Sequence, residues 1–319
     1  MIPMVFLFSV VAFLIILAPP GDYLSEFAAQ LAETTGQELD AEMLEFLRER
    51  YGLDKPVYVQ YLKWMKGVVR WDFGRSLEYK RPVAELINER LAMTVVLTSF
   101  TVLFTWTLAI PIGIISAVRQ YSILDYIFTF TSYIGVGTPN FVLALLLMYL
   151  AFDWFDVNAT GLFSQEYFDA PWSVGRVIDM LKHLWLPMII LGTDGMAGLT
   201  RVVRANLLDE LSKPYVETAR AKGLPEWKVV MKYPVRLAIN PFISVAGWTL
   251  PQLFSGSLIV ATVMNLPTIG PLLLRALLAQ DMFMAGSILL ILTVLTLIGT
   301  FLSDVLLTWL DPRIRVGIA

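Results

Sequence analysis

Stretches without any charged residue constrain this 319-residue chain more than any other feature of its sequence. Five are free of charge altogether, namely 1–21, 91–118, 126–152, 237–274 and 282–303. A sixth stretch, Leu184–Thr200, is interrupted only by Asp194. Crossing a bilayer takes about 20 predominantly apolar residues in a helix. Because each stretch reaches or approaches that length, and only 16% of the residues are charged, we predict an all-α polytopic membrane protein.

The composition also excludes several classes of protein. There is no Cys and only one His, His183, which rules out disulfides, thiolate metal sites and metal sites built from several imidazoles. A net charge of −3 provides no basic face for nucleic acid. No Gly-Lys dipeptide occurs, so the Walker A loop that cradles ATP phosphates is absent. We therefore expect no catalytic residue, no metal site and no cofactor within this chain.

The distribution of Lys and Arg predicts the topology. Eleven basic residues fall in 119–125, 201–236 and 311–319, against three in 153–183 and 275–281. Short basic loops face the cytoplasm, which gives six transmembrane helices with both termini cytoplasmic. Met1–Ala18 lacks the basic start and cleavage site of a signal peptide, so we interpret it as a true span. The predicted domains are a first span (1–20), an extracytoplasmic helical segment (21–90), and a five-span core (91–319) with a cytoplasmic loop at 204–236.

Amphipathic patterns predict two helices in the extracytoplasmic segment. One covers Glu38–Tyr51, and the other starts at Pro56, a favourable first helical position. The expected apolar face of the second helix consists of Val57, Tyr61, Met65 and Val68. Three further aromatic residues are candidates for the membrane interface: Trp64, Trp71 and Phe73. A packed cap over the spans is the favoured interpretation, and a docking ledge for a partner is the alternative.

Proline and glycine interrupt the apolar stretches in several places. We expect the second and third spans to be regular helices apart from Pro111–Gly113 and Gly135–Pro139, where close packing is the default explanation. The stretch 237–274 is too long for one span, and we divide it into a helix at about 240–263 and a re-entrant or interfacial segment at 266–274.

Asp194 is a functional candidate because a charge within a span is expensive to bury. The neighbouring Gly192 and Gly195 suggest a break in the helix or a shallow, wet position. We place a structural role for Asp194 ahead of contact with a substrate.

The cytoplasmic loop Leu211–Arg236 has the pattern of two short helices joined by a glycine. Pro214 suits a helix start, and Glu217 lies near the positive end of the helix dipole. Gly223 ends this helix, because glycine readily adopts the left-handed conformation, and Pro225 precedes a second helix. Isolated helices below about 12 residues are marginal in water. With no other large cytoplasmic segment in the chain, this elbow implies a protein partner.

The elbow sequence Glu217–Gly223 resembles the E-A-A-x-x-x-G motif of ABC-importer permeases. The longer stretch Pro214–Gly223 is similar to the dipeptide/oligopeptide/nickel branch of that family. Further matching stretches are Asp72–Ser76 with Pro82-Val83 after it, Thr138–Phe141, and Leu310–Arg315. Together they make the resemblance specific and extend it over essentially the whole chain. Three features depart from the pattern: Thr218 replaces an alanine, Tyr233–Arg236 replaces the hydrophobic-x-Leu-Pro ending, and the usual Arg-bearing start is absent.

The resemblance implies the permease subunit of an ATP-driven, binding-protein-dependent importer in a bacterial or archaeal cytoplasmic membrane. Its partners would be a second homologous permease, two cytoplasmic ATPase subunits that bind ATP and Mg, an extracytoplasmic substrate-binding protein and membrane lipid, without nucleic acid. The substrates implied are di- or oligopeptides or oligosaccharides; nickel would want ligands that this chain lacks. The residues assigned by the motif to ATPase coupling are Tyr215, Glu217, Thr218, Ala219, Arg220, Lys222 and Gly223.

Polar residues inside apolar helices are the candidates for the substrate path. These are Thr138, Asn140, Trp248 and Gln252, with Asp194 as a further candidate. An ion-driven secondary transporter remains the alternative function, although no inverted repeat is visible and such a protein has no use for the elbow. An intramembrane aspartyl protease is less favoured, since Asp194 and Asp304 would be its only acids and no supporting motif surrounds them.

Overall fold

The computed structural model describes residues 2–18, 23–25, 28, 33, 41–157, 159–168, 170–239 and 258–310. The chain divides into two compact units, each assembled from separate stretches of sequence. Unit 1 comprises Met1–Thr94 and Thr268–Leu297, and unit 2 comprises Val95–Pro267 and Ile298–Ala319. Each unit is described by itself.

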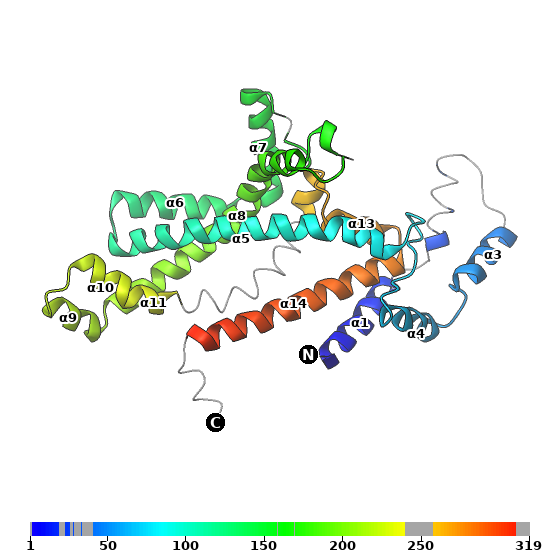
Figure 1. Ribbon diagram of the computed structural model, residues 1–319, viewed down its shortest axis with the longest axis horizontal. Helices are drawn as coiled ribbons and strands as arrows, with labels where there is room; N and C mark the ends of the chain where they lie inside the picture. The colour runs from blue at the N-terminus through cyan, green and yellow to red at the C-terminus, as the bar shows by residue number, and fades with distance from the viewer. Residues whose placement is uncertain are drawn as a thin grey trace. The chain divides into compact units, whose positions relative to one another are not determined.

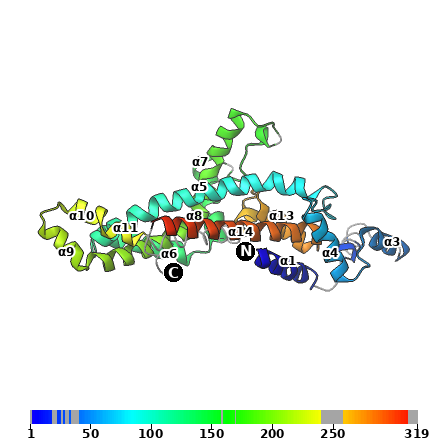
Figure 2. The ribbon, with the colours of Figure 1, turned by 60° about the horizontal axis from the view of Figure 1, so that its bottom comes forward.

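Helices make up the regular secondary structure of the described residues, beside a single isolated bridge between Arg75 and Pro82. The prediction of an all-helical protein is therefore confirmed. Figures 1 and 2 show the helices from two directions. They are α1 (Ile2–Ile16), α3 (Ala41–Tyr51), α4 (Val57–Val68), α5 (Val83–Val118), α6 (Ile123–Gly137), α7 (Asn140–Phe155), the 3₁₀ turn η1 (Gln165–Tyr167), α8 (Val174–Leu211), α9 (Pro214–Ala221), α10 (Glu226–Lys232), α11 (Pro234–Ala238), α13 (Ile269–Leu278) and α14 (Met282–Leu310).

Two helices within the described residues are long and apolar enough to cross a membrane by themselves: α5 and the portion Met282–Val305 of α14. A third span results if α6 and α7 count as one, although they meet at an angle of 106°. The irregularity predicted at Gly135–Pro139 is therefore present, as a sharp bend between two helices. Thr138 precedes Pro139, whose ring disfavours helical backbone at the residue before it. Thr138 is accordingly extended, and α6 ends at Gly137.

The core of unit 1 brings α4 together with α1, α13 and the start of α14. Phe13 and Trp64 stack with their ring centroids 5.6 Å apart, and Tyr61 packs edge-on against Phe13. Trp64 is 3% exposed and donates its indole N–H to Ser287 at 3.3 Å. The expected interfacial position is therefore wrong for Trp64, which is a core residue. The predicted apolar face of α4 is also wrong at Val57, which is exposed.

Residues 72–83 form a tight loop in unit 1 that is fastened to Asp281. Ser76 Oγ donates to Asp281 Oδ2 at 2.5 Å, and the backbone amides of Leu77 and Glu78 donate to the same oxygen at 2.8 and 3.2 Å. Asp281 Oδ1 accepts from the amide of Met284 at 3.1 Å, which caps the start of α14. Burial raises the pKa of the Asp281 carboxyl, and these hydrogen bonds oppose that shift. The loop is therefore held by one fully buried carboxylate rather than by apolar packing alone.

In unit 2, α8 packs against α6, α7 and α11. Glycines permit the closest approaches to it. A Cβ on Gly113 of α5 would lie 2.8 Å from the Val203 side chain, and one on Gly192 of α8 would lie 2.8 Å from the Phe104 ring. Small residues at such positions let membrane helices approach closely. The close-packing explanation for Gly113 is confirmed, whereas the predicted break beside Asp194 is wrong, since α8 runs through it as one helix.

Candidate functional site

The elbow follows α8 after a short turn and consists of α9, a glycine turn and α10. In both views it lies at the end of α8 remote from α7 (Figures 1 and 2). Pro214 occupies the first position of α9, Glu217 its first turn and Arg220 its last turn, as predicted. Gly223 has a φ of 73°, the left-handed conformation expected after a helix end. The sequence prediction of helix, glycine turn and helix is therefore confirmed in geometry.

An ion pair joins the two elbow helices across the glycine turn. Arg220 Nη2 lies 2.6 Å from Glu226 Oε1, with both side chains about half exposed. The hydrogen bond from Arg220 holds the pKa of Glu226 below its ordinary value. Exposed pairs of this kind contribute little to stability because water and salt screen them. The pair therefore orients exposed side chains of the elbow and contributes little to the stability of the elbow.

A small apolar core holds the elbow instead. Val216 and Ala219 of α9 and Val229 of α10 are buried together, with Tyr215 and Leu224 packed against them. The argument that only an external partner could support such short helices is therefore wrong.

Tyr215 also ties α9 back to α8. Its hydroxyl donates to Glu210 Oε2 at 2.6 Å. Burial, and then this hydrogen bond, raise the pKa of Tyr215 above its ordinary value. The elbow is consequently built onto the end of α8 by contacts within this chain, and most of its outer side chains are exposed.

The residues assigned to ATPase coupling divide into an exposed and a supporting group. Ala219 is buried and Tyr215 is half-buried, so these two support the elbow from inside. The other five are exposed: Glu217, Thr218, Arg220, Lys222 and Gly223. Beside them, Trp227 is 66% and Met231 is 51% exposed on one face of α10. Trp227 and Met231 are four residues apart on a short basic helix, so they share one face. This spacing is the sequence signal that could have added both residues to the site.

A second apolar cluster joins the elbow to the rest of unit 2. Leu207 of α8, Ala117 of α5, Val230 of α10 and Val235 of α11 are buried against one another. The end of α5, the final turns of α8 and the elbow therefore form one packed body.

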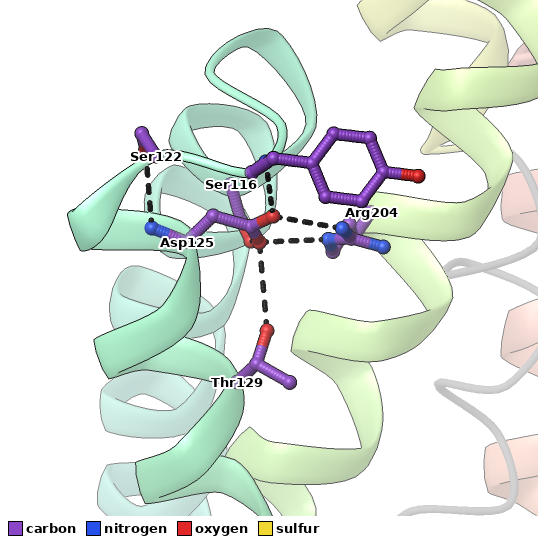
Figure 3. A network of polar contacts seen from close by, with 6 residues as sticks. Ser116, Ser122, Asp125, Thr129 and Arg204 are labelled. Atoms are coloured by element: carbon purple, nitrogen blue, oxygen red, sulfur yellow. Dashed lines mark hydrogen bonds and ion pairs between the residues drawn. The ribbon is translucent and has the colours of Figure 1, made fainter.

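An ion pair between the buried Asp125 and the half-buried Arg204 lies at the same end of unit 2, between the start of α6 and α8 (Figure 3). Arg204 approaches Asp125 with two nitrogens, Nε to Oδ1 at 2.9 Å and Nη2 to Oδ2 at 2.8 Å. Ser116 Oγ also donates to Asp125 Oδ1, and the amide of Tyr121 donates to Oδ2 at 2.9 Å. In turn, the amide of Asp125 donates to Ser122 Oγ at the start of α6.

Neither member of this pair is among the residues predicted to be functional from the sequence. The serine at position 122 followed three residues later by an acid is a helix-start pattern, and this was the only available signal for Asp125. Nothing in the local sequence connects it with Arg204.

Three of the five predicted substrate-path residues lie within the described part of the chain. Thr138 and Asn140 flank the bend between α6 and α7, and both are half-buried. Asp194 is exposed on α8. Trp248 and Gln252 lie outside the described residues. The structure thus places Thr138 and Asn140 together and does not bring Asp194 into a described pocket.

A cavity of about 600 Å³ lies between the segment after α7 and the first part of α8. It is lined by Val157, Thr160, Gly161, Phe163, Ser164, Gln165, Phe168, His183 and Asn265. Asp179 fixes one wall by accepting from the amide and hydroxyl of Ser164 at 2.7 and 2.5 Å. His183 Nδ1 lies 2.9 Å from the carbonyl of Asp179. Among the described residues, no three acidic or histidine side chains gather where they could hold a metal ion.

These features define a helical membrane protein with a paired-helix elbow mounted on the end of one long helix. Comparison with known families identifies the class. Residues 109–316 match the family described as binding-protein-dependent transport system inner membrane component, and residues 1–98 match the N-terminal region of such components. The chain belongs to this family and is a membrane permease subunit of a binding-protein-dependent importer.

Several characterised relatives align over almost their whole length. The oligopeptide transport system permease protein AppB of Bacillus subtilis is 36% identical over 98% of this chain and 96% of its own. The dipeptide transport system permease protein DppB of Alkalihalophilus pseudofirmus is 31% identical over 99% of this chain and 96% of its own. The glutathione transport system permease protein GsiC of Escherichia coli K12 is 32% identical over the same shares. The predicted resemblance to the dipeptide and oligopeptide branch is confirmed.

Proposed function

We propose that this permease carries di- or oligopeptides across the membrane, and that its elbow receives the force of ATP hydrolysis from a separate ATPase subunit. The relatives with peptide and glutathione permease names support the substrate class. The exposed face of Trp227 and Met231 beside the five exposed motif residues is the observation that carries the coupling role. ATP and Mg bind to the partner subunits, because the sequence has no Walker A loop.

The topology that accompanies this proposal has six spans with both termini cytoplasmic. The eleven basic residues of 119–125, 201–236 and 311–319 support it through the preference of short basic loops for the cytoplasm. The elbow then lies in the cytoplasm, where an ATPase can reach it. A second homologous permease completes the translocation path, and an extracytoplasmic binding protein delivers the peptide.

The elbow suits force transmission because it is supported from inside and open outside. Buried aromatic side chains dominate the energetics of protein interfaces. Trp227 is exposed in this chain, so burial in a cleft of the ATPase would remove a large apolar surface from water. Movement of the ATPase would displace the elbow as a unit, because the core around Val216, Ala219 and Val229 prevents α9 and α10 from moving separately.

The bend between α6 and α7 supports a substrate path near Thr138 and Asn140. Backbone that leaves the helical conformation at membrane depth is tolerated only where protein covers it or where it lines a water-filled cavity. Asp194, Trp248 and Gln252 remain the other proposed path residues. Peptide uptake by Thr138→Val and Asn140→Leu variants tests this part, since both substitutions keep the approximate size and remove the polar group. Unchanged KM and maximal rate in both variants would exclude the bend from the path.

The coupling role is tested by the affinity of the purified permease pair for its ATPase subunits. Trp227→Ala should weaken this binding at least tenfold, since an aromatic anchor at an interface contributes about 2 kcal/mol or more. Trp154→Ala is the matched control, because Trp154 of α7 is equally exposed at 68% but lies away from the elbow. Equal affinities of the two variants would contradict coupling through this face. Peptide uptake that persists without any ATPase subunit would instead favour an ion-driven transporter.

The substrate class is tested separately on the cognate binding protein. Thermal shift with peptide and oligosaccharide libraries should stabilise it with peptides. Stabilisation by oligosaccharides alone would overturn the peptide assignment and leave the coupling role intact.

A further inference from the structure

The ion pair Asp125–Arg204 has more hydrogen-bond partners than a contact that only stabilises the fold requires. Asp125 is almost completely buried and accepts hydrogen bonds from α5, from the α5–α6 turn and from α8 through Ser116, Tyr121 and Arg204. A bidentate arginine–carboxylate contact fixes orientation as well as distance, because both groups are planar. The pair therefore fixes the start of α6 against α8 in one geometry (Figure 3).

Energetic arguments favour a positional role over a stabilising one. Replacing a buried ion pair with apolar residues of similar size is often neutral for stability, whereas removing one partner alone is strongly destabilising. A pair such as Asp125–Arg204 is thus weak evidence for stability. What an apolar replacement cannot reproduce is the fixed mutual orientation of the two helices.

The position of the pair connects two parts of the proposed mechanism. Arg204 lies one helical turn before Leu207, the α8 residue buried against Val230 of the elbow and Val235 of α11. At the other end of α6, beyond Gly137, is the 106° bend. A displacement of the elbow is therefore transmitted to α8 through apolar packing, and from α8 to α6 through the ion pair.

We propose that Asp125 and Arg204 are positioning residues that make α6, α8 and the elbow move as one body, so that ATP hydrolysis in the partner subunit is coupled to movement of the α6–α7 bend. This inference rests on the proposed coupling role of the elbow. Without the pair, the elbow still docks onto its ATPase, but α6 does not follow it.

The first experiment compares transport with ATP consumption in the complete transporter, reconstituted in liposomes with its binding protein and a bound peptide. In the double variant Asp125→Leu with Arg204→Met, we expect unchanged affinity for the ATPase and at least a fivefold fall in peptide transported per ATP hydrolysed. Arg204→Lys, which keeps the charge but not the bidentate contact, should give a smaller fall. The control is Arg81→Ala with Glu85→Ala, an ion pair whose side chains are about half exposed and whose loss should leave the ratio unchanged.

A merely structural role predicts a different pattern. Assembly, ATP hydrolysis and transport would then fall in parallel while their ratio stays constant, and that result would overturn the proposal. Loss of ATPase affinity in Trp227→Ala reports on the elbow alone. A failure of the coupling role is therefore distinguishable from a failure of this inference.

The second experiment leaves the ion pair intact, so that it does not depend on whether the variants fold. The chain has no cysteine, and spin labels can be placed by Tyr126→Cys on α6 and Lys232→Cys on α10 of the elbow, both exposed positions. The distance between the labels should remain the same in the nucleotide-free and the nucleotide-trapped transporter. A distance that changes between these states would show that α6 and the elbow move independently, and the proposal would be wrong.

Discussion

Removal of the Asp281 carboxylate gives a quantitative test of how unit 1 is held together. Asp281 is fully buried and accepts from Ser76 Oγ and from the amides of Leu77, Glu78 and Met284. In Asp281→Ala, all four donors lose their acceptor. The hydroxyl of Ser76 can rotate toward another acceptor, but the two buried amides of Leu77 and Met284 are fixed by the backbone.

The expected loss follows from these two amides. A buried donor without an acceptor costs about 1–3 kcal/mol. Two such donors give about 2–6 kcal/mol, and relief of the buried charge reduces the upper end, so we expect Asp281→Ala to lower the free energy of unfolding by about 2–5 kcal/mol. Asp281→Asn keeps the size and one acceptor oxygen. The side-chain NH2 group of this Asn faces either the donors of the loop or the backbone amide of Met284, so only one of the two sides keeps an acceptor. We therefore expect about half of the loss in free energy of unfolding.

Unfolding of the purified permease by SDS in mixed micelles, followed by tryptophan fluorescence, measures these differences. Asp72→Ala is the matched control, because Asp72 accepts one exposed hydrogen bond, from the amide of Gly74 at 3.0 Å. That variant should lose less than about 1 kcal/mol. An Asp281→Ala variant as stable as the Asp72→Ala control would refute the idea that the carboxylate holds the loop.

Two glycines provide further predictions, both with Gly198→Ala as control, since a Cβ on Gly198 meets no atom within 4 Å. Gly113→Ala places a Cβ 2.8 Å from the Val203 side chain and 3.0 Å from the Thr200 carbonyl oxygen. It should destabilise the packing of α5 on α8 by about 1–3 kcal/mol in the same SDS titration, and stability equal to the control would contradict the close approach. Gly223→Ala meets no neighbour but forces alanine into a φ of 73°, at a cost of roughly 1–2 kcal/mol. Hydrogen exchange of the α9 amides should therefore accelerate roughly tenfold, and unchanged exchange would mean that the turn tolerates any residue.

The elbow was the most predictable part of the molecule because its signals are local. Pro214 fixes its own φ, and Gly223 is needed where the chain turns left-handed. Neither residue depends on a distant neighbour for its effect. The break after Gly137 follows from Pro139 in the same way, although nothing in the local sequence sets its angle of 106°.

The errors arose where burial depends on distant segments. Trp64 carries an aromatic ring and an N–H group, which suits a membrane interface as well as a core with a hydrogen-bond acceptor. The deciding contact is Ser287, which lies far along the chain. Likewise, Gly192 predicts a helix break or a shallow, wet position beside Asp194, whereas the structure places it in the continuous helix α8 against Phe104 of α5. Periodicity and composition carry no information about such partners.

Asp125 and Asp281 show why local patterns reveal only part of a buried acid's role. Both lie at the start of a helix, where an acid is expected to interact with free amides and the helix dipole. A carboxylate has about four acceptor sites, and capping uses one or two of them. In Asp281 one oxygen caps α14 through Met284, and the other binds Ser76 with its following amides. In Asp125 the carboxylate leaves the capping of α6 to Ser122 and binds Arg204 and Ser116 instead. In a chain this poor in charge, an acid at a helix start is therefore a candidate for long-range fastening.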